Sequence, residues 1–269
     1  DEGNDVILGG LGADTVNGNL GHDLIVGDNG SFNGVTVQPN WVLSSVQTTD
    51  TTDVTGGVDV LHGDDGDDLI LGGLDGDAIT GDNGNDAIVG DNGSISTIVY
   101  DAAGLKSIGL IASEVSTLGG ADTINGNEGN DAILGGAGAD VRLNGHNGHD
   151  FIIGDNGKLE SLDVQPVLKV ATIQTTDTNV ATGGADNIQG NAGDDLVLGG
   201  VAGDDIAADE GNNVVLGDNG RIIFASGKLD LIESAEAGAV DASGGVTQPA
   251  LGGNDVITSG RGDDTIIGG

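Results

Sequence analysis

The chain has 269 residues, of which 53 are glycine, and its 44 acidic and 7 basic residues give a formal net charge of −37. It has no cysteine, which excludes a disulfide scaffold, a thiolate zinc site and a thiol nucleophile. An acidic surface would repel phosphate, which argues against nucleic-acid binding, and no apolar run approaches the ~18 residues needed to span a bilayer.

Disorder is the main alternative that this composition raises. High net charge, 2% aromatic residues and abundant glycine are typical of chains that cannot bury enough apolar surface to offset their ordering entropy. However, 36% of the residues are hydrophobic, and they recur periodically. We therefore expect a chain that folds only when something cancels its charge. It opens within a repeat unit and shows no signal peptide, so we expect a piece of a longer array.

A nine-residue repeat runs through most of the sequence. Residues 9–17 are followed directly by 18–26, and the frame returns at 63–71, 81–89, 126–134, 145–153 and 190–198. Glycine holds positions one and four, aspartate holds position six and an aliphatic residue holds position eight. The position-six aspartates, partial units included, are Asp5, Asp14, Asp23, Asp59, Asp68, Asp77, Asp86, Asp122, Asp131, Asp140, Asp150, Asp186, Asp195, Asp204, Asp255 and Asp264. Asn213 interrupts this series, and an extra residue near Arg142 predicts a bulge.

A longer period lies on top of the nonapeptide. Gly-Asp-Asn-Gly occurs at 27–30, 90–93, 154–157 and 217–220, and a stretch without the repeat follows each copy. The chain is therefore expected to alternate repeat blocks (1–30, 56–93, 119–157, 183–220 and 252–269) with inserts (31–55, 94–118, 158–182 and 221–251). Whether successive blocks form one continuous stack depends on how many half-turns each insert adds, which the sequence leaves open.

The repeat predicts an all-β fold of stacked coils. Six glycine-rich residues form a turn, because glycine permits positive φ, and the three residues after the aspartate form a short strand. Two nonapeptides make a coil of about 18 residues, and coils stack as parallel strands about 4.8 Å apart. The position-eight aliphatic residues of two facing sheets then fill a thin core, which needs no aromatic side chains.

Such stacking brings the position-six carboxylates together along each edge. Neighbouring pairs repel by roughly 1 kcal/mol in water and more at a lower dielectric. Over sixteen residues this is comparable with the whole stability of a domain, about 5–15 kcal/mol. The seven basic residues cannot neutralise these rows, since most of them lie in the inserts. Carboxylate and carbonyl oxygens favour Ca²⁺ over Mg²⁺, which demands a stricter octahedron.

The motif Gly-Gly-x-Gly-x-Asp-x-aliphatic-x, as in residues 9–17, resembles the calcium-binding nonapeptide of the RTX (repeats-in-toxin, hemolysin-type) family. The resemblance covers roughly 60% of the chain and implies a right-handed parallel β-roll with multiple Ca²⁺ ions along its edges. It implies that the position-six aspartates of loops n and n+2, with turn carbonyls, are the ligands. The implied pairs are Asp5 with Asp23, Asp59 with Asp77, Asp68 with Asp86, Asp122 with Asp140, Asp131 with Asp150, and Asp186 with Asp204. Asp195 would face Asn213, which should weaken that site, and shifted glycines disturb the frame at Asp77 and Asp204.

The inserts are richer in β-forming residues. The first contains Phe32, Val35, Val37, Trp41, Val42, Leu43 and Val46, which predict strands or a hairpin. Two interpretations stand side by side: a flap that covers the sheet of the roll, which we favour slightly, and a lateral surface for self-assembly or for another protein. In the second insert, Leu105, Ile108 and Ile111 have helical spacing and predict a short helix within 101–116.

Two further sets of residues have a structural and a functional interpretation. Asp28, Asp91, Asp155 and Asp218 of the Gly-Asp-Asn-Gly copies are either turn formers, which we favour, or extra ligands. The four histidines, His22, His62, His146 and His149, occupy variable repeat positions, so we expect no metal or catalytic role for them. No catalytic motif is present, and the chain is not expected to be an enzyme.

We therefore expect a calcium-binding structural region of a secreted or cell-surface bacterial protein, such as an adhesin stalk, surface-layer or filament segment. The RTX resemblance implies export in one step by type I secretion, and folding on calcium outside the cell. The alternative is a calcium-binding accessory module of a secreted protease, lipase or epimerase. Ice binding by outward threonines is disfavoured, because they form no continuous row.

Overall fold

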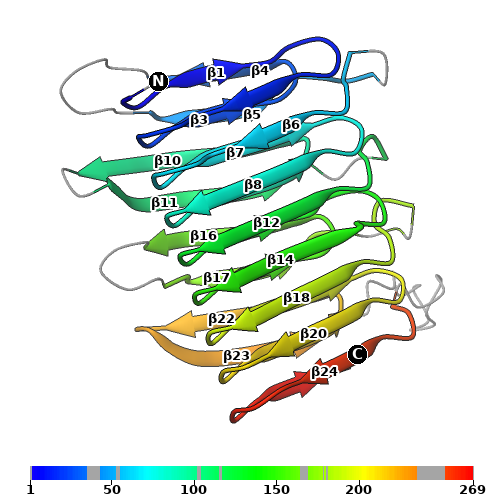
Figure 1. Cartoon of the computed structure of the whole chain (residues 1–269). Coiled ribbons are helices and arrows are strands. Elements are labelled where there is room, and N and C mark those ends of the chain that lie inside the picture. Colours follow the sequence, from blue (N-terminus) through cyan, green and yellow to red (C-terminus); the bar gives the residue numbers. More distant parts are fainter. Residues whose placement is uncertain are drawn as a thin grey trace, which may run out of the picture.

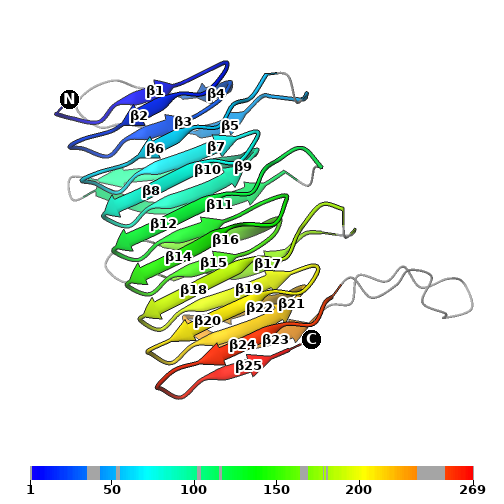
Figure 2. The same cartoon turned by 45° about the vertical axis from the view of Figure 1, so that its right-hand side comes forward.

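The computed structural model describes residues 2–34, 43–52, 55–101, 104–114, 117–163, 169–177, 179, 181–234 and 252–268. These residues form strands and turns, with no α-helix among them, and they build one parallel β-roll with a third sheet on one side. The coils stack in chain order, so that the two termini lie at opposite ends of the stack (Figures 1 and 2). None of the described segments is a helix that could span a membrane.

The first wall of the roll is a nine-stranded parallel sheet. Each of its strands follows a position-six residue and begins at position seven. In spatial order they are β1 (Val6–Leu8), β3 (Leu24–Val26), β7 (Leu69–Gly73), β9 (Ala87–Asp91), β13 (Ala132–Leu134), β15 (Phe151–Ile153), β19 (Leu196–Gly200), β21 (Val214–Asp218) and β25 (Thr265–Ile267).

The second wall is an eight-stranded parallel sheet built from the alternate nonapeptides. Its strands, in spatial order, are β2 (Thr15–Asn17), β6 (Val60–His62), β8 (Ala78–Asn83), β12 (Thr123–Glu128), β14 (Arg142–Asn147), β18 (Asn187–Ala192), β20 (Asp205–Asp209) and β24 (Val256–Ser259). The extra residue near Arg142 is absorbed before β14, where the N–H groups of Val141 and Arg142 both donate to the carbonyl of Asp122.

The inserts form the third sheet, which is antiparallel and which we call the cover sheet. Each insert supplies one hairpin: β4 (Gly30–Asn33) with β5 (Ser45–Thr48), β10 (Gly93–Asp101) with β11 (Gly104–Ser113), β16 (Gly157–Asp163) with β17 (Thr172–Thr175), and β22 (Gly220–Ala225) with β23 (Lys228–Ser234). The hairpins also pair with one another, in the order β23-β22-β17-β16-β11-β10-β5-β4, so the sheet is continuous.

Two hydrophobic cores result. Between the two walls, the position-eight residues form two facing rows of aliphatic side chains, with Ile25 and Ile70 from the nine-stranded wall and Leu61 and Ile79 from the eight-stranded wall. The second core lies between the nine-stranded wall and the cover sheet, where Leu69 and Leu71 pack in the same cluster as Ile95, Ile108 and Ile111. All three residues of strands such as β3, β13 and β15 are therefore buried, and not the central one alone.

The predicted helix in the second insert is wrong, and part of the predicted hairpin in the first insert lies outside the described residues. Residues 104–113 form the strand β11 and not a helix, because Leu105, Ile108 and Ile111 all meet the second core while β11 pairs with both β10 and β16. In the first insert, Phe32 and Val46 lie in paired strands, whereas Val35, Val37, Trp41 and Val42 fall outside the described residues.

Candidate metal centre

The position-six residues lie in two columns, one at the start of the strands of each wall. The nine-strand column contains Asp5, Asp23, Asp68, Asp86, Asp131, Asp150, Asp195, Asn213 and Asp264. The eight-strand column contains Asp14, Asp59, Asp77, Asp122, Asp140, Asp186, Asp204 and Asp255. Every expected pair is adjacent in its column. The neighbours across an insert, such as Asp23 and Asp68, are equally close, although no pair of this kind was expected.

Every rung of these columns repeats one hydrogen bond. The backbone N–H of a position-six residue donates to Oδ1 of the next position-six side chain in the stack. Asp59 N–H donates to Oδ1 of Asp77 at 2.8 Å, and Asp68 N–H donates to Oδ1 of Asp86 at 2.8 Å. This bond holds the carboxylates in register, and it uses only one oxygen of each.

The second carboxylate oxygen is buried and without a donor. Oδ2 has almost no solvent exposure and no hydrogen-bond partner in Asp14, Asp23, Asp59, Asp68, Asp77, Asp86, Asp122, Asp131, Asp140, Asp150, Asp186, Asp195 and Asp204. Buried polar atoms are normally satisfied, because an orphan costs about 1–3 kcal/mol and a charged one costs more. Thirteen such atoms in two straight columns therefore mark places where a ligand belongs.

Glycine at position one leaves the room that such a ligand needs. A Cβ on Gly18 would collide with Oδ2 of Asp23 and with the carbonyl oxygen of Gly63 in the next coil of that column. In the other column, a Cβ on Gly27 would meet Oδ2 of Asp59 and the carbonyl oxygen of Gly72 in the same way. The unpaired carboxylate oxygen and a carbonyl oxygen therefore converge on one small space at both turns, and the same convergence recurs at Gly72, Gly90 and Gly154.

Without a cation these carboxylates resist ionisation. Burial, followed by the charge of neighbouring carboxylates, raises the pKa of Asp77 to about 9 and that of Asp150 to about 9. Burial likewise raises the pKa of Asp68 to about 8 and lifts the pKa of Asp86 well above its ordinary value. Among the described residues the ion pairs join Lys158 to Glu160, Arg221 to Glu233 and His62 to Asp82, and none of these reaches a column.

The donor set fits a hard divalent cation. Carboxylate and backbone carbonyl oxygens are the ligands of Ca²⁺, which accepts six to eight of them in flexible geometry. Over the part of the chain that the structure describes, no three acidic or histidine side chains gather around one point. A cation would therefore be held by carboxylates of adjacent rungs together with turn carbonyls, and not by a compact cluster of side chains.

In the nine-strand column, Asn213 has a side-chain amide where the other position-six residues have a carboxylate. Its Nδ2 donates to the carbonyl oxygen of Ala208 at 3.2 Å, and Ala208 stands where the other rungs have a position-one glycine. The side-chain oxygen still accepts the N–H of Asp195 at 2.9 Å, so the column continues. The neutral amide of Asn213 thus donates to a turn carbonyl oxygen which, at the other rungs, would be free to bind a cation.

The aspartates of the Gly-Asp-Asn-Gly copies accept hydrogen bonds that join the ends of the inserts to the coils of the roll. Oδ1 of Asp155 accepts the N–H of Gly184 at 2.7 Å, where the third insert ends, and its Oδ2 accepts the N–H of Val201 in the next coil. Asp91 makes the same two bonds to Gly120 and Ala137. Both oxygens of Asp91 and Asp155 are used, which agrees with the turn-forming interpretation of the motif. In Asp28, Oδ2 accepts the N–H of Leu74, but Oδ1 is buried without a hydrogen-bond partner, as a ligand oxygen would be.

The sequence analysis missed a further row at position five of alternate repeats. His22 Nδ1 accepts the N–H of Asp67 at 2.8 Å, and Oδ1 of Asp67 in turn accepts the N–H of Asn85 at 2.9 Å. The signal was present, because Asn, Asp or His occupies this position in every repeat of the nine-strand column, whereas in the eight-strand column only the last repeat has such a residue, Asn254. The row gives His22 and His149 a backbone-accepting role through Nδ1.

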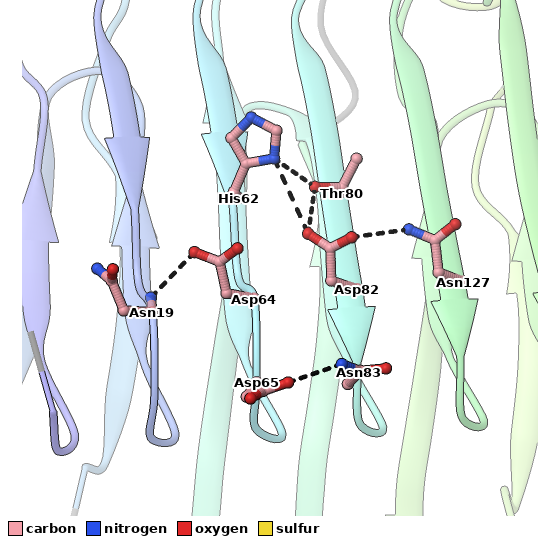
Figure 3. A network of polar contacts seen from close by, with 8 residues as sticks. All are labelled: Asn19, His62, Asp64, Asp65, Thr80, Asp82, Asn83 and Asn127. Atoms are coloured by element: carbon pink, nitrogen blue, oxygen red, sulfur yellow. Dashed lines mark hydrogen bonds and ion pairs between the residues drawn. The ribbon is translucent and has the colours of Figure 1, made fainter.

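A polar network also crosses the exposed turns at the opposite end of the eight-stranded wall (Figure 3). His62 Nδ1 lies 2.7 Å from Oγ1 of Thr80, which donates to Oδ2 of Asp82 at 2.8 Å, and Asn127 donates to Oδ1 of the same carboxylate at 3.2 Å. Asn19, Asp82 and Asn127 have φ between 72° and 78°, a conformation that Asn and Asp tolerate better than most residues. These contacts join neighbouring turns.

A stack of parallel coils whose turns repeat a buried, unpaired carboxylate oxygen, in most cases with a carbonyl oxygen facing it, defines a calcium-binding β-roll. The family model of the RTX calcium-binding nonapeptide repeat matches residues 1–31, 49–79, 62–94, 115–141, 142–158, 180–215 and 250–269, which together make up more than half of the chain. The chain belongs to the RTX calcium-binding nonapeptide repeat family, whose repeats bind multiple calcium ions. A search of curated proteins finds no match to it.

Proposed function

We propose that this chain is a calcium-binding structural repeat segment of a secreted or cell-surface bacterial protein, which folds when calcium enters its two columns outside the cell. The observation that carries the proposal is the two rows of buried, unpaired Oδ2 atoms that run from coil to coil between Asp14 and Asp204, across the first three inserts. Adhesin stalks, surface layers and filaments are the structural settings in which a continuous rod of this kind serves.

The assignment of ligands forms part of the proposal. Each cation lies between successive rungs and takes Oδ2 of the position-six aspartates and the carbonyl oxygen of a position-one glycine. All sixteen position-six aspartates named above take part, whereas Asn213 does not. Asp5, Asp255 and Asp264 belong to the terminal coils, and their Oδ2 atoms are not among the buried, unpaired ones.

Calcium supplies the free energy that the bare chain lacks. A formal charge of −37 opposes compaction, and the buried carboxylates carry a large desolvation penalty. A ligand that binds only the folded state stabilises that state by mass action. Extracellular calcium modules have dissociation constants of about 10⁻⁴–10⁻³ M, so a chain with such sites stays unfolded where calcium is scarce and folds where calcium is millimolar.

The direct test is circular dichroism during a calcium titration, followed by return with EGTA. We expect a coil-like spectrum in chelator, a cooperative rise of the strand signal with calcium, and reversal on chelation. Electron microscopy of the same samples should show rods only in calcium. A full strand signal in chelator would refute calcium-driven folding, and enzymatic activity of the isolated chain would refute the purely structural function.

A further inference from the structure

The chain contains an internal repeat with a period of 127 residues, so that Asp28, for example, corresponds to Asp155. Individual hydrogen bonds of the first half recur at the equivalent positions of the second. Asn29 Nδ2 donates to Oδ1 of Asp50 at 2.9 Å, and Asn156 Nδ2 donates to Oδ1 of Asp177 at 3.1 Å. In the position-five row, the bond from Asp67 to His22 recurs as the bond from Asp194 to His149. The two halves can therefore be compared position by position.

In the first half, a tyrosine covers the position-five row. Tyr100 lies on β10 near the tip of the second hairpin, with its ring centroid 5.9 Å from that of His22 and the two planes 35° apart. It packs against the second core. Beneath it Asp67 is only 7% exposed and Ala87 is 1% exposed, while His22 is half-buried.

In the second half, the residue at the position of Tyr100 is Gly227. The hairpin of β22 and β23 turns back there, with Ser226 and Gly227 at positive φ, and it is shorter than the hairpin of β10 and β11. The residues below lose their cover: His149 and Asp194 are exposed, and Val214, which corresponds to Ala87, is half-buried.

The space left by this difference is a cavity of about 360 Å³. Its apolar lining consists of Phe151, Val170, Leu196, Val214, Phe224 and Leu229. Its polar lining consists of His149, Lys169, Asp194 and Asn212. An apolar cavity with a few polar groups at its edge is the usual form of a small-molecule site, and 300–1,000 Å³ is the usual range. The chain itself places a phenol ring at the corresponding position of its first half.

We infer that this cavity is a binding site for a phenol-type aromatic ring, supplied either by a tyrosine side chain of another polypeptide or by a free phenolic compound. The ring takes the place that Tyr100 occupies in the first half: over His149, and against the apolar side chains that the shorter hairpin leaves uncovered. A bound aromatic ring removes apolar surface from water and faces an imidazole, as the ring of Tyr100 does.

The test is binding of p-cresol and of N-acetyltyrosinamide to the full chain in saturating calcium, followed by nuclear magnetic resonance and calorimetry. We expect one site per chain. Tyr100→Ala should open the corresponding site in the first half and raise the number to two. Val214→Trp should fill the cavity and weaken binding at least tenfold. Val60→Trp, an equal enlargement on the outer face of the eight-stranded wall, should leave binding unchanged.

The two probes separate the possible sources of the ring. Binding of both shows that the cavity admits a tyrosine that is part of a peptide, whereas binding of p-cresol alone shows that only a free phenol fits. Failure of both probes to bind would overturn the inference, as would binding that Val214→Trp leaves unchanged. Circular dichroism in calcium establishes that each variant is folded before its binding is measured.

Discussion

The backbone N–H of Asp77 donates a 2.7 Å hydrogen bond to Oδ1 of Asp122, although 45 residues and a complete β-hairpin separate the two. Within a block, the same bond joins residues 18 apart, as from Asp59 to Asp77. The insert therefore leaves the roll at the end of a strand of the nine-stranded wall and returns without disturbing the next coil. The columns continue as if the inserts were absent.

The geometry of strands explains why the inserts recur in every second coil. Adjacent strands in any sheet lie about 4.7–4.9 Å apart, so a two-stranded hairpin is as wide as two coils of the roll. One hairpin for every two coils thus keeps the cover sheet in step with the wall beneath it. This spacing allows neighbouring hairpins to pair, as β11 does with β16.

Removing the charge of Asp122 should weaken calcium binding. Asp122→Asn keeps an acceptor for Asp77 but places an amide where Oδ2 was, as Asn213 does naturally. We expect loss of bound calcium at this rung and a higher calcium midpoint for folding, measured by calorimetry and circular dichroism. Asp122→Ala should in addition lose the hydrogen bond, worth about 1 kcal/mol. Asp205→Asn, on an exposed strand position, is the matched control and should change neither quantity.

Restoring the missing carboxylate should have the opposite effect. Asn213→Asp supplies an Oδ2 in a column where both neighbours are aspartates, so we expect one additional calcium ion per chain and a higher melting temperature in calcium. In chelator the same variant should be less stable, because it adds a buried charge. Asn33→Asp, an equal change of charge on the exposed end of β4, is the control. Unchanged calcium stoichiometry in Asn213→Asp would contradict the ligand assignment.

The calcium-free chain should respond to acid. Burial raises the pKa of Asp68 to about 8 and those of Asp77 and Asp150 to about 9, against 3.8 for ordinary aspartate. Between pH 4 and 8 the folded state then binds more protons than the unfolded state, so its stability falls as the pH rises through this window. We expect more strand signal at pH 5 than at pH 8 in metal-free buffer. In calcium the dependence should reverse, because protons compete with the cation.

The cover sheet should contribute to stability through the second core. Ile111 on β11 is fully buried there, and Ile111→Ala should cost about 2–5 kcal/mol of unfolding free energy, because it removes apolar contacts and leaves a cavity. Thermal unfolding in saturating calcium measures the effect. Val99→Ala, at a position 43% exposed on the neighbouring strand, should cost far less. Equal effects of the two substitutions would mean that the cover sheet does not pack as described.

Much of the site could be predicted from residue spacing alone. The position-six series named the residues of both columns, and the stacking of identical coils is enough to predict that Asp59 lies beside Asp77. The neighbours across an insert could not be predicted, because the number of half-turns in an insert is a property of its path and not of its length. The same limit applies to Asp23 and Asp68.

A difference between alternate repeats in the sequence indicates that one wall of the roll is covered, although this was not predicted. Alternate repeats carry an apolar residue at position nine, such as Leu71, whereas nearly all of the repeats between them carry a polar one there, such as Asn17. This difference marks the wall that is covered. The helical spacing in the second insert misled because the pairing of β10 with β11 shifts register between Val99 and Tyr100. The register skips Lys106, so Leu105 and Ile108, three residues apart, both reach the second core.

The amino-acid sequence by itself determined the coil, the two facing rows of aliphatic residues and the acidic columns, because each depends only on a nine-residue period that every stacked copy must obey. The tertiary structure alone decided that the roll runs unbroken, that the four hairpins merge into one sheet, and that Gly227 leaves a cavity where Tyr100 fills one. These features depend on where segments far apart in the chain meet, and no local period encodes that.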